Sequence, residues 1–167
     1  MTDPQAAVAI VRAREPEESI LLMRRATREG DPWSGHWSLP GGRREPHDPD
    51  LLHTALRELE EECGVRLTPD NLETPLEHTF VGRMVGTRML VAPFVFSVPH
   101  ELPTVVDPEE AAEAMWLPLR ILRDPTRHAV HSVPGMPVDK QFPGIELNGV
   151  PLWGFTYHLV TDWLGMK

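Results

Sequence analysis

Apolar and polar residues alternate in short blocks along the chain, and the blocks predict strands and helices mixed in one fold. The apolar runs that predict buried strands lie at residues 6–13, 20–25 and 87–97. Residues 38–42 predict a strand end that runs into a glycine pair, and residues 120–128 predict a short helix. Residues 129–150 are rich in proline and glycine and predict irregular chain, whereas residues 151–165 predict a closing amphipathic helix. The predicted class is α/β, in which helices cover a mixed sheet.

Residues 48–64 carry the clearest helical pattern in the chain. The apolar side chains that recur at the spacing of one helix face are Leu52, Ala55, Leu56, Leu59 and Cys63. This stripe is expected to face the core. Asp48 is a candidate helix cap, Pro49 suits the first turn, and Gly64 suits the position just past the helix end.

A second face of the same helix is acidic. Glu58, Glu61 and Glu62 lie at positions i, i+3 and i+4, roughly 120° around the helix from the apolar stripe. Like charges at this spacing cost an isolated helix about 0.2–0.5 kcal/mol per pair. A divalent cation between the carboxylates removes that cost, and Mg²⁺ prefers oxygen ligands of this kind. The alternative is a solvated acidic face, but it leaves the glycine pair before the helix unexplained.

Composition limits the classes of partner. The chain has 167 residues, with 16 Lys and Arg against 25 Asp and Glu, so its formal charge is -9. Such a surface repels nucleic acid and anionic lipid, and an anionic substrate would need a local cation. The single cysteine, Cys63, excludes an intrachain disulfide and a Cys-rich zinc site. No apolar run approaches the roughly 20 residues of a membrane span.

The length and the N-terminal residues give two further expectations. A chain of this size is expected to form a single domain over residues 1–167. The first ten residues contain Asp3 and no basic residue before the apolar stretch, which makes a poor signal peptide. We therefore expect a cytoplasmic protein.

The residues 57–65, RELEEECGV, resemble the second half of the Nudix box, and every defined position agrees. The first half of the box matches only with a shift. Fourteen residues separate Gly42 from Arg57 where the box has thirteen, and Pro49 stands where the box has glutamate. Asp48 and Glu45 are the two candidates for that role.

The spacing with one extra residue resembles that of a particular branch of the Nudix hydrolases, the coenzyme A diphosphatases. The segment GGRREPHDPDLLHTALRELEEECG fits the pattern of that branch, and LLMRR, SLPGG and LWGFTY resemble its other motifs with some departures. The resemblance implies a Nudix-type α/β/α sandwich with a mixed sheet. It also implies Mg²⁺ or Mn²⁺ as cofactor, with Glu58, Glu61 and Glu62 as its ligands and Arg57 orienting them.

The activity implied by the resemblance is hydrolysis of a phosphoanhydride in a nucleoside diphosphate linked to another group. Gly41 and Gly42 are expected to lie beside the substrate, and Arg25, Arg43 and Arg44 are candidates to contact its phosphates, with surface solubility as the alternative. One of the helix glutamates is a candidate base for the attacking water. The candidates outside the helix are Glu109, Glu110 and Glu113, for which exposed positions on a helix are the alternative.

Aromatic residues have two possible roles. Trp33 and Trp37 flank Gly35 and either stack on a base or pack the loop, while Trp153, Phe155 and Tyr157 pack a core edge or line a substrate pocket.

The leading substrate is coenzyme A or a derivative of it. The alternatives are an ADP-ribose, nucleotide-sugar or nucleoside triphosphate pyrophosphohydrolase, and a Nudix module that senses a nucleotide without chemistry. The retention of all three box glutamates argues against the last. The expected partner is a small molecule, with no nucleic acid and no membrane, and a homodimer would suit the Trp- and Pro-rich segments.

Overall fold

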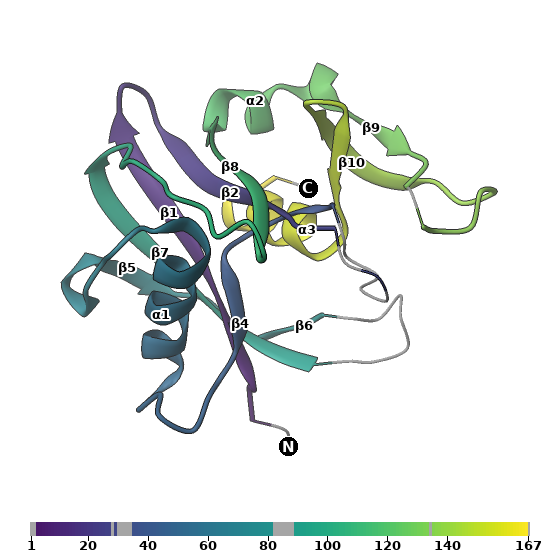
Figure 1. The fold of residues 1–167 in the computed structure, drawn as a ribbon. Coiled ribbons are helices and arrows are strands. Elements are labelled where there is room, and N and C mark those ends of the chain that lie inside the picture. Colours follow the sequence, from purple (N-terminus) through teal and green to yellow (C-terminus); the bar gives the residue numbers. More distant parts are fainter. Residues whose placement is uncertain (1–2, 28, 30–34, 82–88, 134, 167) are drawn as a thin grey trace.

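The computed structural model describes residues 3–27, 29, 35–81, 89–133 and 135–166, and Figure 1 shows their arrangement. The strands are β1 Ala6–Glu15, β2 Ser19–Arg25, β3 Trp37–Ser38, β4 Gly41–Arg43, β5 Leu72–Pro75, β6 Thr79–Val81, β7 Met89–His100, β8 Ala111–Pro118, β9 His128–His131, β10 Phe142–Leu147 and β11 Val150–Trp153. The helices are α1 Leu51–Cys63, α2 Leu119–Arg123 and α3 Gly154–Trp163, with short 3₁₀ turns at Pro69–Asn71 and Pro125–Arg127.

The main sheet is mixed, as predicted. Strand β1 lies at its centre and runs parallel to β7 in a register that pairs Ala6 with Val91 and Glu15 with His100. On its other side β1 pairs antiparallel with two strands in succession, first β4 and then β2. Strands β3 and β8 pair with β2, and β5 and β6 pair with β7. The glycine pair therefore lies next to the first residues of the central strand.

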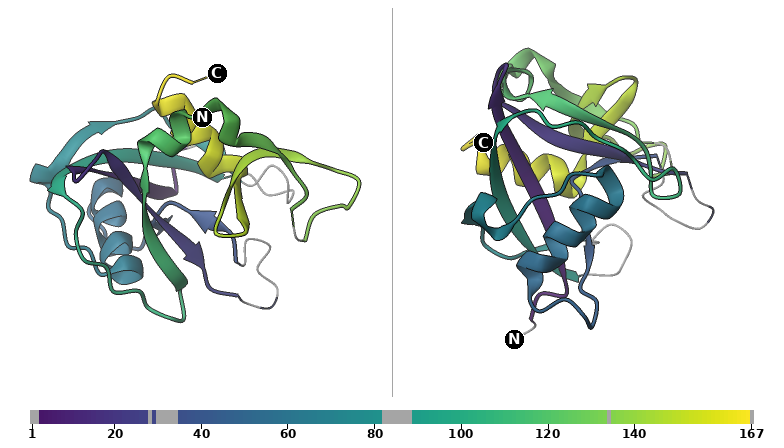
Figure 2. Two further views of the ribbon diagram at one scale, coloured as in Figure 1. Left: turned by 90° about the horizontal axis from the view of Figure 1, so that it is seen from above. Right: turned by 60° about the vertical axis from the view of Figure 1, so that its left-hand side comes forward.

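The two faces of the sheet are covered by different helices. Side chains alternate along a strand, so Ala7, Ala9 and Val11 of β1 belong to the buried cluster under α1. Ile10 of β1 belongs to the cluster on the opposite face, which contains Tyr157 and Val160 of α3. Figure 2 shows α1 and α3 on opposite sides of the sheet. The chain thus has the α/β architecture and the helix–sheet–helix layers that the motif implied.

Several predicted elements are confirmed with shifted limits. Strands β1 and β2 match the first two apolar runs, and α2 matches the predicted short helix. The glycine-pair strand divides into β3 and β4 around Leu39 and Pro40. The third apolar run becomes β7, whose described residues begin at Met89. Within the described residues no helix is long and apolar enough to cross a membrane.

Three expectations were wrong. Residues 129–150 are only partly irregular, because β9, β10 and β11 form an antiparallel sheet of their own, while the described residues between His131 and Phe142 carry no helix or strand. The closing segment begins as strand β11 and becomes helical only at Gly154. Glu113 lies in strand β8 and Glu110 in the turn before it, so the proposed helix-surface alternative fails. Short paired strands bridged by proline and glycine carry little periodicity of their own, which explains the first error.

Candidate active site on helix α1

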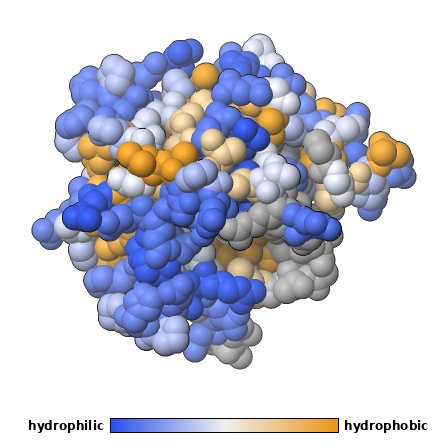
Figure 3. Space-filling model, in the orientation of Figure 1, coloured by the Kyte–Doolittle hydropathy of each residue, from blue (hydrophilic) through white to orange (hydrophobic). Residues whose placement is uncertain are grey.

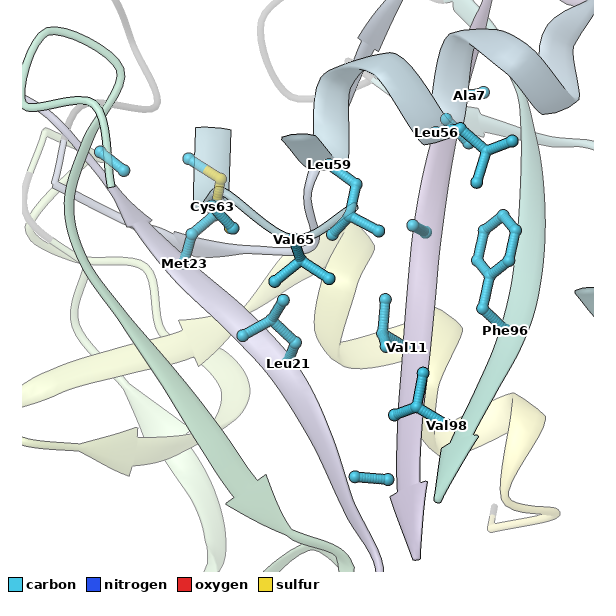
Figure 4. Close-up of a cluster of buried hydrophobic side chains, with 14 residues drawn as sticks. Ala7, Val11, Leu21, Met23, Leu56, Leu59, Cys63, Val65, Phe96 and Val98 are labelled. Carbon is cyan, nitrogen blue, oxygen red and sulfur yellow. The ribbon is translucent and has the colours of Figure 1, made fainter. Parts of the chain in front are cut away.

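The apolar stripe fixes helix α1 to the sheet. Ala55, Leu59 and Cys63 are fully buried against β1, β2 and β7, and Leu56 is nearly so. Figure 4 shows Leu56, Leu59 and Cys63 pointing from the helix into this cluster. The outward side of the helix is hydrophilic (Figure 3). A helix anchored in this way holds its polar side chains in constant positions, which a catalytic site requires.

Helix α1 begins and ends at residues whose chemistry explains its limits. Asp50 is the N-cap, and its carboxylate accepts a hydrogen bond from the backbone N–H of His53 at 2.9 Å. The expectation that Asp48 caps the helix was therefore wrong by two residues. At the other end Gly64 adopts a left-handed φ of 68° and donates its N–H to the carbonyl of Glu60, as predicted.

Glu62 is buried between the helix and the glycine pair. Its side chain accepts a hydrogen bond of 2.8 Å from the backbone N–H of Gly41, and the residue is 3% exposed. Burial, and after it the charge of Glu58, raises the pKa of Glu62 to about 8. A smaller rise comes from Glu110 and a smaller fall from Arg25, so both of those charges act on the Glu62 carboxyl.

Glu58 lies against Gly42. A Cβ atom on Gly42 would overlap the carboxylate of Glu58, so the glycine is what allows β4 and α1 to approach here. Burial raises the pKa of Glu58 to about 7, followed by a hydrogen bond with Glu61, while Arg57 opposes the rise. Glu61 is more exposed than its two neighbours. The structure brings the three predicted glutamates onto one side of α1, at different depths.

Arg57 connects the helix to the loop before it. Its Nε and Nη2 donate to Asp48 at 3.0 and 2.9 Å, and Nη1 donates to Glu58 at 2.7 Å and to Glu61 at 3.1 Å. Nη2 also donates to the carbonyl of Arg43 at 3.1 Å. A guanidinium has five N–H groups, and all five find an acceptor here. The predicted role of Arg57 in orienting the glutamates has a geometric basis.

Asp48 is the candidate from the shifted half of the motif that lies against Arg57. It is almost fully buried and forms the two-point ion pair with Arg57, whereas Glu45 lies 3.7 Å from Arg57 Nη1. The hydrogen bond from Arg57 holds the pKa of Asp48 well below its usual range. Asp48 also accepts from the backbone N–H of Glu45 and from Thr54 Oγ1, each at 2.9 Å. Of the two candidates, Asp48 forms the closer ion pair with Arg57.

The arginines near the glycine pair differ in what they contact. Arg25 ends β2, next to a register shift, and its charge lowers the pKa of Glu62. Arg43 ends β4 and is exposed. Arg44 donates to the carbonyls of Asp48 and Pro49 at 3.2 and 3.0 Å, which ties it to the loop. The assignment of Arg25, Arg43 and Arg44 as phosphate contacts stays a prediction.

The three acidic candidates outside the helix also differ in what they contact. Glu113 pairs with Arg24 at 2.9 Å, and the backbone N–H of Glu109 bonds the Asp107 carboxylate. Glu110 accepts a hydrogen bond from Ala26 N–H through its own carbonyl, which fixes this turn beside the end of β2. Of the three candidates, Glu110 has a charge that raises the pKa of Glu62.

A cavity of about 770 Å³ lies on the α3 side of the sheet, between β6, β10 and the start of α3. Its aromatic lining residues are Phe80, Phe142, Trp153, Phe155 and Trp163, and its polar ones include Glu77, His78, His158 and Asp162. Sequence reasoning did not find this cavity, although the aromatic segment 153–157 was a partial signal. Of the three aromatic residues in that segment, Trp153 and Phe155 line the cavity.

The remaining aromatics pack the core. Tyr157 bonds His128 Nδ1 at 2.6 Å through its hydroxyl. Trp37 of β3 is buried in the core on the α3 side and donates its indole N–H to the carbonyl of Leu147 at 3.1 Å, which leaves little of it to stack on a base. Trp33 lies outside the described residues.

The donor set of the site suits a hard divalent cation. Within the described ranges no three Asp, Glu, His or Cys side chains already converge as a metal cage, and Arg57 Nη1 contacts both Glu58 and Glu61. Mg²⁺ usually takes only one or two carboxylates, together with waters and substrate phosphates. The two carboxyls whose pKa burial raises, Glu58 and Glu62, would both be stabilised in the ionised form by such a cation. The oxygen donors therefore fit a divalent metal ion.

Comparison with known proteins agrees with this geometry. The NUDIX domain family matches residues 3–136. An uncharacterised protein of Schizosaccharomyces pombe, C14C4.10c, is 34% identical over 110 residues, which are 60% of this chain and 32% of that protein. The uncharacterised Nudix hydrolase NudL of Yersinia pestis is 32% identical over 122 residues, which are 71% of this chain and 57% of NudL.

The matched segments thus span about half or less of these relatives. Among solved structures, the Nudix hydrolase RenU of M. smegmatis superposes with a TM-score of 0.57 at 26% identity, over 72% of this chain and 74% of RenU. On the family match, the fold and the box residues on α1, the chain belongs to the NUDIX domain family.

Proposed function

We propose that the chain hydrolyses a phosphoanhydride bond in a nucleoside diphosphate linked to a further group, with Mg²⁺ or Mn²⁺ as cofactor. The observation that carries the proposal is the hydrogen-bond network of Arg57. It holds Glu58 and Glu61 on one side and the buried Asp48 on the other, next to the close contact of Gly42 with Glu58. The family relationship supports the same activity.

Glu58, Glu61 and Glu62 are the proposed metal ligands. A bound divalent cation supplies neutralisation of the crowded phosphate oxygens and polarises an attacking water. Arg57 keeps two of the carboxylates aimed outward from α1. Gly41 and Gly42 present backbone without side chains beside the substrate, and Arg25 and Arg43 contact its phosphates.

The proton of the attacking water needs an acceptor. Glu62 is one candidate, because the Gly41 N–H holds its buried carboxylate beside the glycine pair. Glu110 is the other, because it lies near enough for its charge to act on the Glu62 carboxyl. Comparing Glu110→Gln with Glu109→Gln tests the second candidate. A loss of turnover confined to Glu110→Gln assigns the base to the turn before β8.

The aromatic cavity is the proposed site for the organic part of the substrate. Strands β4, β1, β7 and β6 are consecutive neighbours, with Gly42 opposite Ala7 and Thr79 opposite Val91. At about 4.8 Å per strand, β4 and β6 are about 14 Å apart within the sheet, while the glutamates lie with α1 on one face and the cavity lies with α3 on the other. Coenzyme A or a derivative is the leading substrate, and ADP-ribose, nucleotide sugars and nucleoside triphosphates are the alternatives.

The test is a panel of these compounds with Mg²⁺, scored by the products released. Phosphopantetheine with 3′,5′-ADP supports the coenzyme A proposal, and AMP with ribose phosphate supports ADP-ribose. Cleavage is expected to stop with EDTA and to return with Mg²⁺ or Mn²⁺. Cleavage that persists in EDTA, or no cleavage of any compound, would contradict the proposal.

A matched pair of variants tests the ligand assignment. Glu62→Gln is expected to lower kcat by at least about 100-fold while the fold survives, as loss of a metal ligand predicts. Glu60→Gln is the control, because Glu60 is an exposed glutamate of the same helix that pairs with Arg66 at 2.8 Å. Equal activity in the two variants would remove Glu62 from the mechanism.

The cytoplasmic location and the homodimer stay predictions of the same proposal. Sedimentation of the purified chain at several concentrations and fractionation of the producing cell would test them.

A further inference from the structure

Thr54 places a fully buried hydroxyl on α1, one turn before Arg57. Its Oγ1 lies 2.9 Å from Asp48 Oδ2 and 3.3 Å from the carbonyl of Asp50. A hydroxyl has a single proton to donate, and a carboxylate is the stronger acceptor. The shorter contact is therefore the hydrogen bond that matters, and it joins the helix to the loop that precedes it.

The carboxylate of Asp48 is held by four donors. Arg57 Nε approaches Oδ1, while Arg57 Nη2, Glu45 N–H and Thr54 Oγ1 all approach Oδ2 at 2.9 Å. The three donors at Oδ2 come from three separate residues, and together with Arg57 Nε at Oδ1 they hold both oxygens of the carboxylate. Thr54 is the one of these donors that belongs to the buried side of α1.

The orientation of Asp48 is passed on by Arg57. A guanidinium is planar, so fixing Nε and Nη2 on Asp48 also fixes the direction of Nη1. Nη1 is the atom that donates to Glu58 at 2.7 Å and to Glu61 at 3.1 Å. The contacts thus run without interruption from the Thr54 hydroxyl to two of the proposed metal ligands.

We propose that Thr54 is a positioning residue for the carboxylate site, acting through Asp48 and Arg57 on Glu58 and Glu61. The proposal rests on the proposed function, because it assigns Thr54 a role in the same site. Loss of the hydroxyl removes one of the three donors at Asp48 Oδ2, which loosens the carboxylate and shifts Arg57 and the two glutamates it holds. Groups that hydrogen-bond directly to metal ligands, as Arg57 does here, typically change metal affinity or activity about 10- to 100-fold when removed. Thr54 lies two contacts further out, so an effect at the lower end of that range is expected.

The first experiment compares Thr54→Val, which keeps the branched shape, with Thr54→Ser, which keeps the hydroxyl. The first readout is the affinity of the metal-free protein for Mn²⁺ alone, measured by titration calorimetry, and the second is kcat. Thr54→Val is expected to weaken Mn²⁺ binding about 10-fold and to lower kcat with little change in KM, while Thr54→Ser stays near the wild type. Thr54→Ala takes the place of the valine variant if that variant fails to fold.

Thr161→Val is the matched control. Thr161 is also a buried helical threonine whose hydroxyl donates to the carbonyl four residues before it, at 2.9 Å to Tyr157, but it lies on α3. It reports the general effect of removing such a hydroxyl. If Thr54→Val and Thr161→Val lower the melting temperature alike and both bind Mn²⁺ as the wild type does, the role of Thr54 is only structural and the proposal fails.

A double-mutant cycle with Asp48→Asn tests whether Thr54 acts through Asp48. If Thr54 acts through Asp48, Thr54→Val adds little further loss of Mn²⁺ affinity in the Asp48→Asn background. Full additivity of the two losses would overturn the proposed route. Since Mn²⁺ affinity needs no substrate, a wild type that binds Mn²⁺ but cleaves nothing contradicts the proposed function alone, whereas a wild type that does not bind Mn²⁺ contradicts both.

Discussion

Gly42 is the single residue on which the approach of β4 to α1 depends. An alanine Cβ there would overlap the Glu58 carboxylate, which is the movable end of a side chain. Because Glu58 can move aside, the substitution should disturb the position of this proposed metal ligand more than the stability of the fold. At Gly41, by contrast, the Cβ would meet the backbone of Ala7 and Val8, which has no room to move.

Gly42→Ala is therefore expected to lower kcat by at least about 10-fold with only a small fall in the melting temperature, since the affected group is a proposed metal ligand. Gly41→Ala is expected to lower the melting temperature clearly, because it disturbs the pairing of β4 with β1. Steady-state kinetics and thermal denaturation of both variants check the contrast. A fully active Gly42→Ala enzyme would mean that the position of Glu58 is unimportant.

The buried carboxyl of Glu62 gives a pH dependence to the stability of the metal-free protein. Its pKa is raised in the folded chain to about 8 from an ordinary value of 4.5. A raised folded pKa contributes stability that is present below the unfolded pKa and is lost as the pH rises through about 8. In EDTA, Glu62→Gln is thus expected to be more stable than the wild type at pH 9 and similar to it at pH 4. Urea denaturation at both pH values measures this, and the same difference at both would contradict the assignment.

At the scale of elements, the helix that carries the site was the best predicted part of the chain. Its apolar residues repeat over the full length of α1, and Gly64 ends it as expected. The N-cap of α1 was placed two residues too early, because Asp48 and Asp50 are both residue types that cap helices. Only the loop geometry shows that Arg57 takes Asp48, which leaves Asp50 to the His53 N–H.

Asp50→Ala is expected to destabilise the chain by about 1 kcal/mol, the usual cost of removing an N-cap. Its effect on kcat should be small, because the carboxylate of Asp50 contacts His53 and not Arg57. Chemical denaturation and steady-state kinetics measure the two effects. A loss of activity without a loss of stability would place Asp50 in the site instead.

What sequence reasoning could not reach were contacts between distant segments. The aromatic cavity joins β6 to α3, and the role of Glu110 depends on the turn before β8 lying beside β2. Strand β10 contains Pro143 and Gly144, residues that local patterns assign to loops. These features arise from pairing partners that lie far away in the chain, which no local pattern records.

At the scale of the whole molecule, the residues after the family match complete the core. The match ends at residue 136, yet Ile145, Leu152 and Val160 are fully buried against β1 and β2 on the α3 side of the sheet. These residues come from β10, β11 and α3. The segment after residue 136 is therefore a layer of the fold.

Leu152→Ala is expected to destabilise the protein by about 2–5 kcal/mol, the usual range for a buried leucine. Val138→Ala is the control, since Val138 is 95% exposed and its truncation should change stability by less than about 0.5 kcal/mol. Denaturant unfolding curves of both variants decide the question. Equal stability of the two would mean that the α3 layer is dispensable.

The parallel pairing of β1 with β7 also bears on how the chain is made. During synthesis β1 leaves the ribosome long before β7, yet Ala6 must find Val91 and Glu15 must find His100. Until then the nascent chain carries an apolar strand without its neighbour, and α3, which covers the second face, emerges later still. The native pairing can therefore form only after β7 has been made, and until then the apolar side chains of β1 are open to non-native contacts.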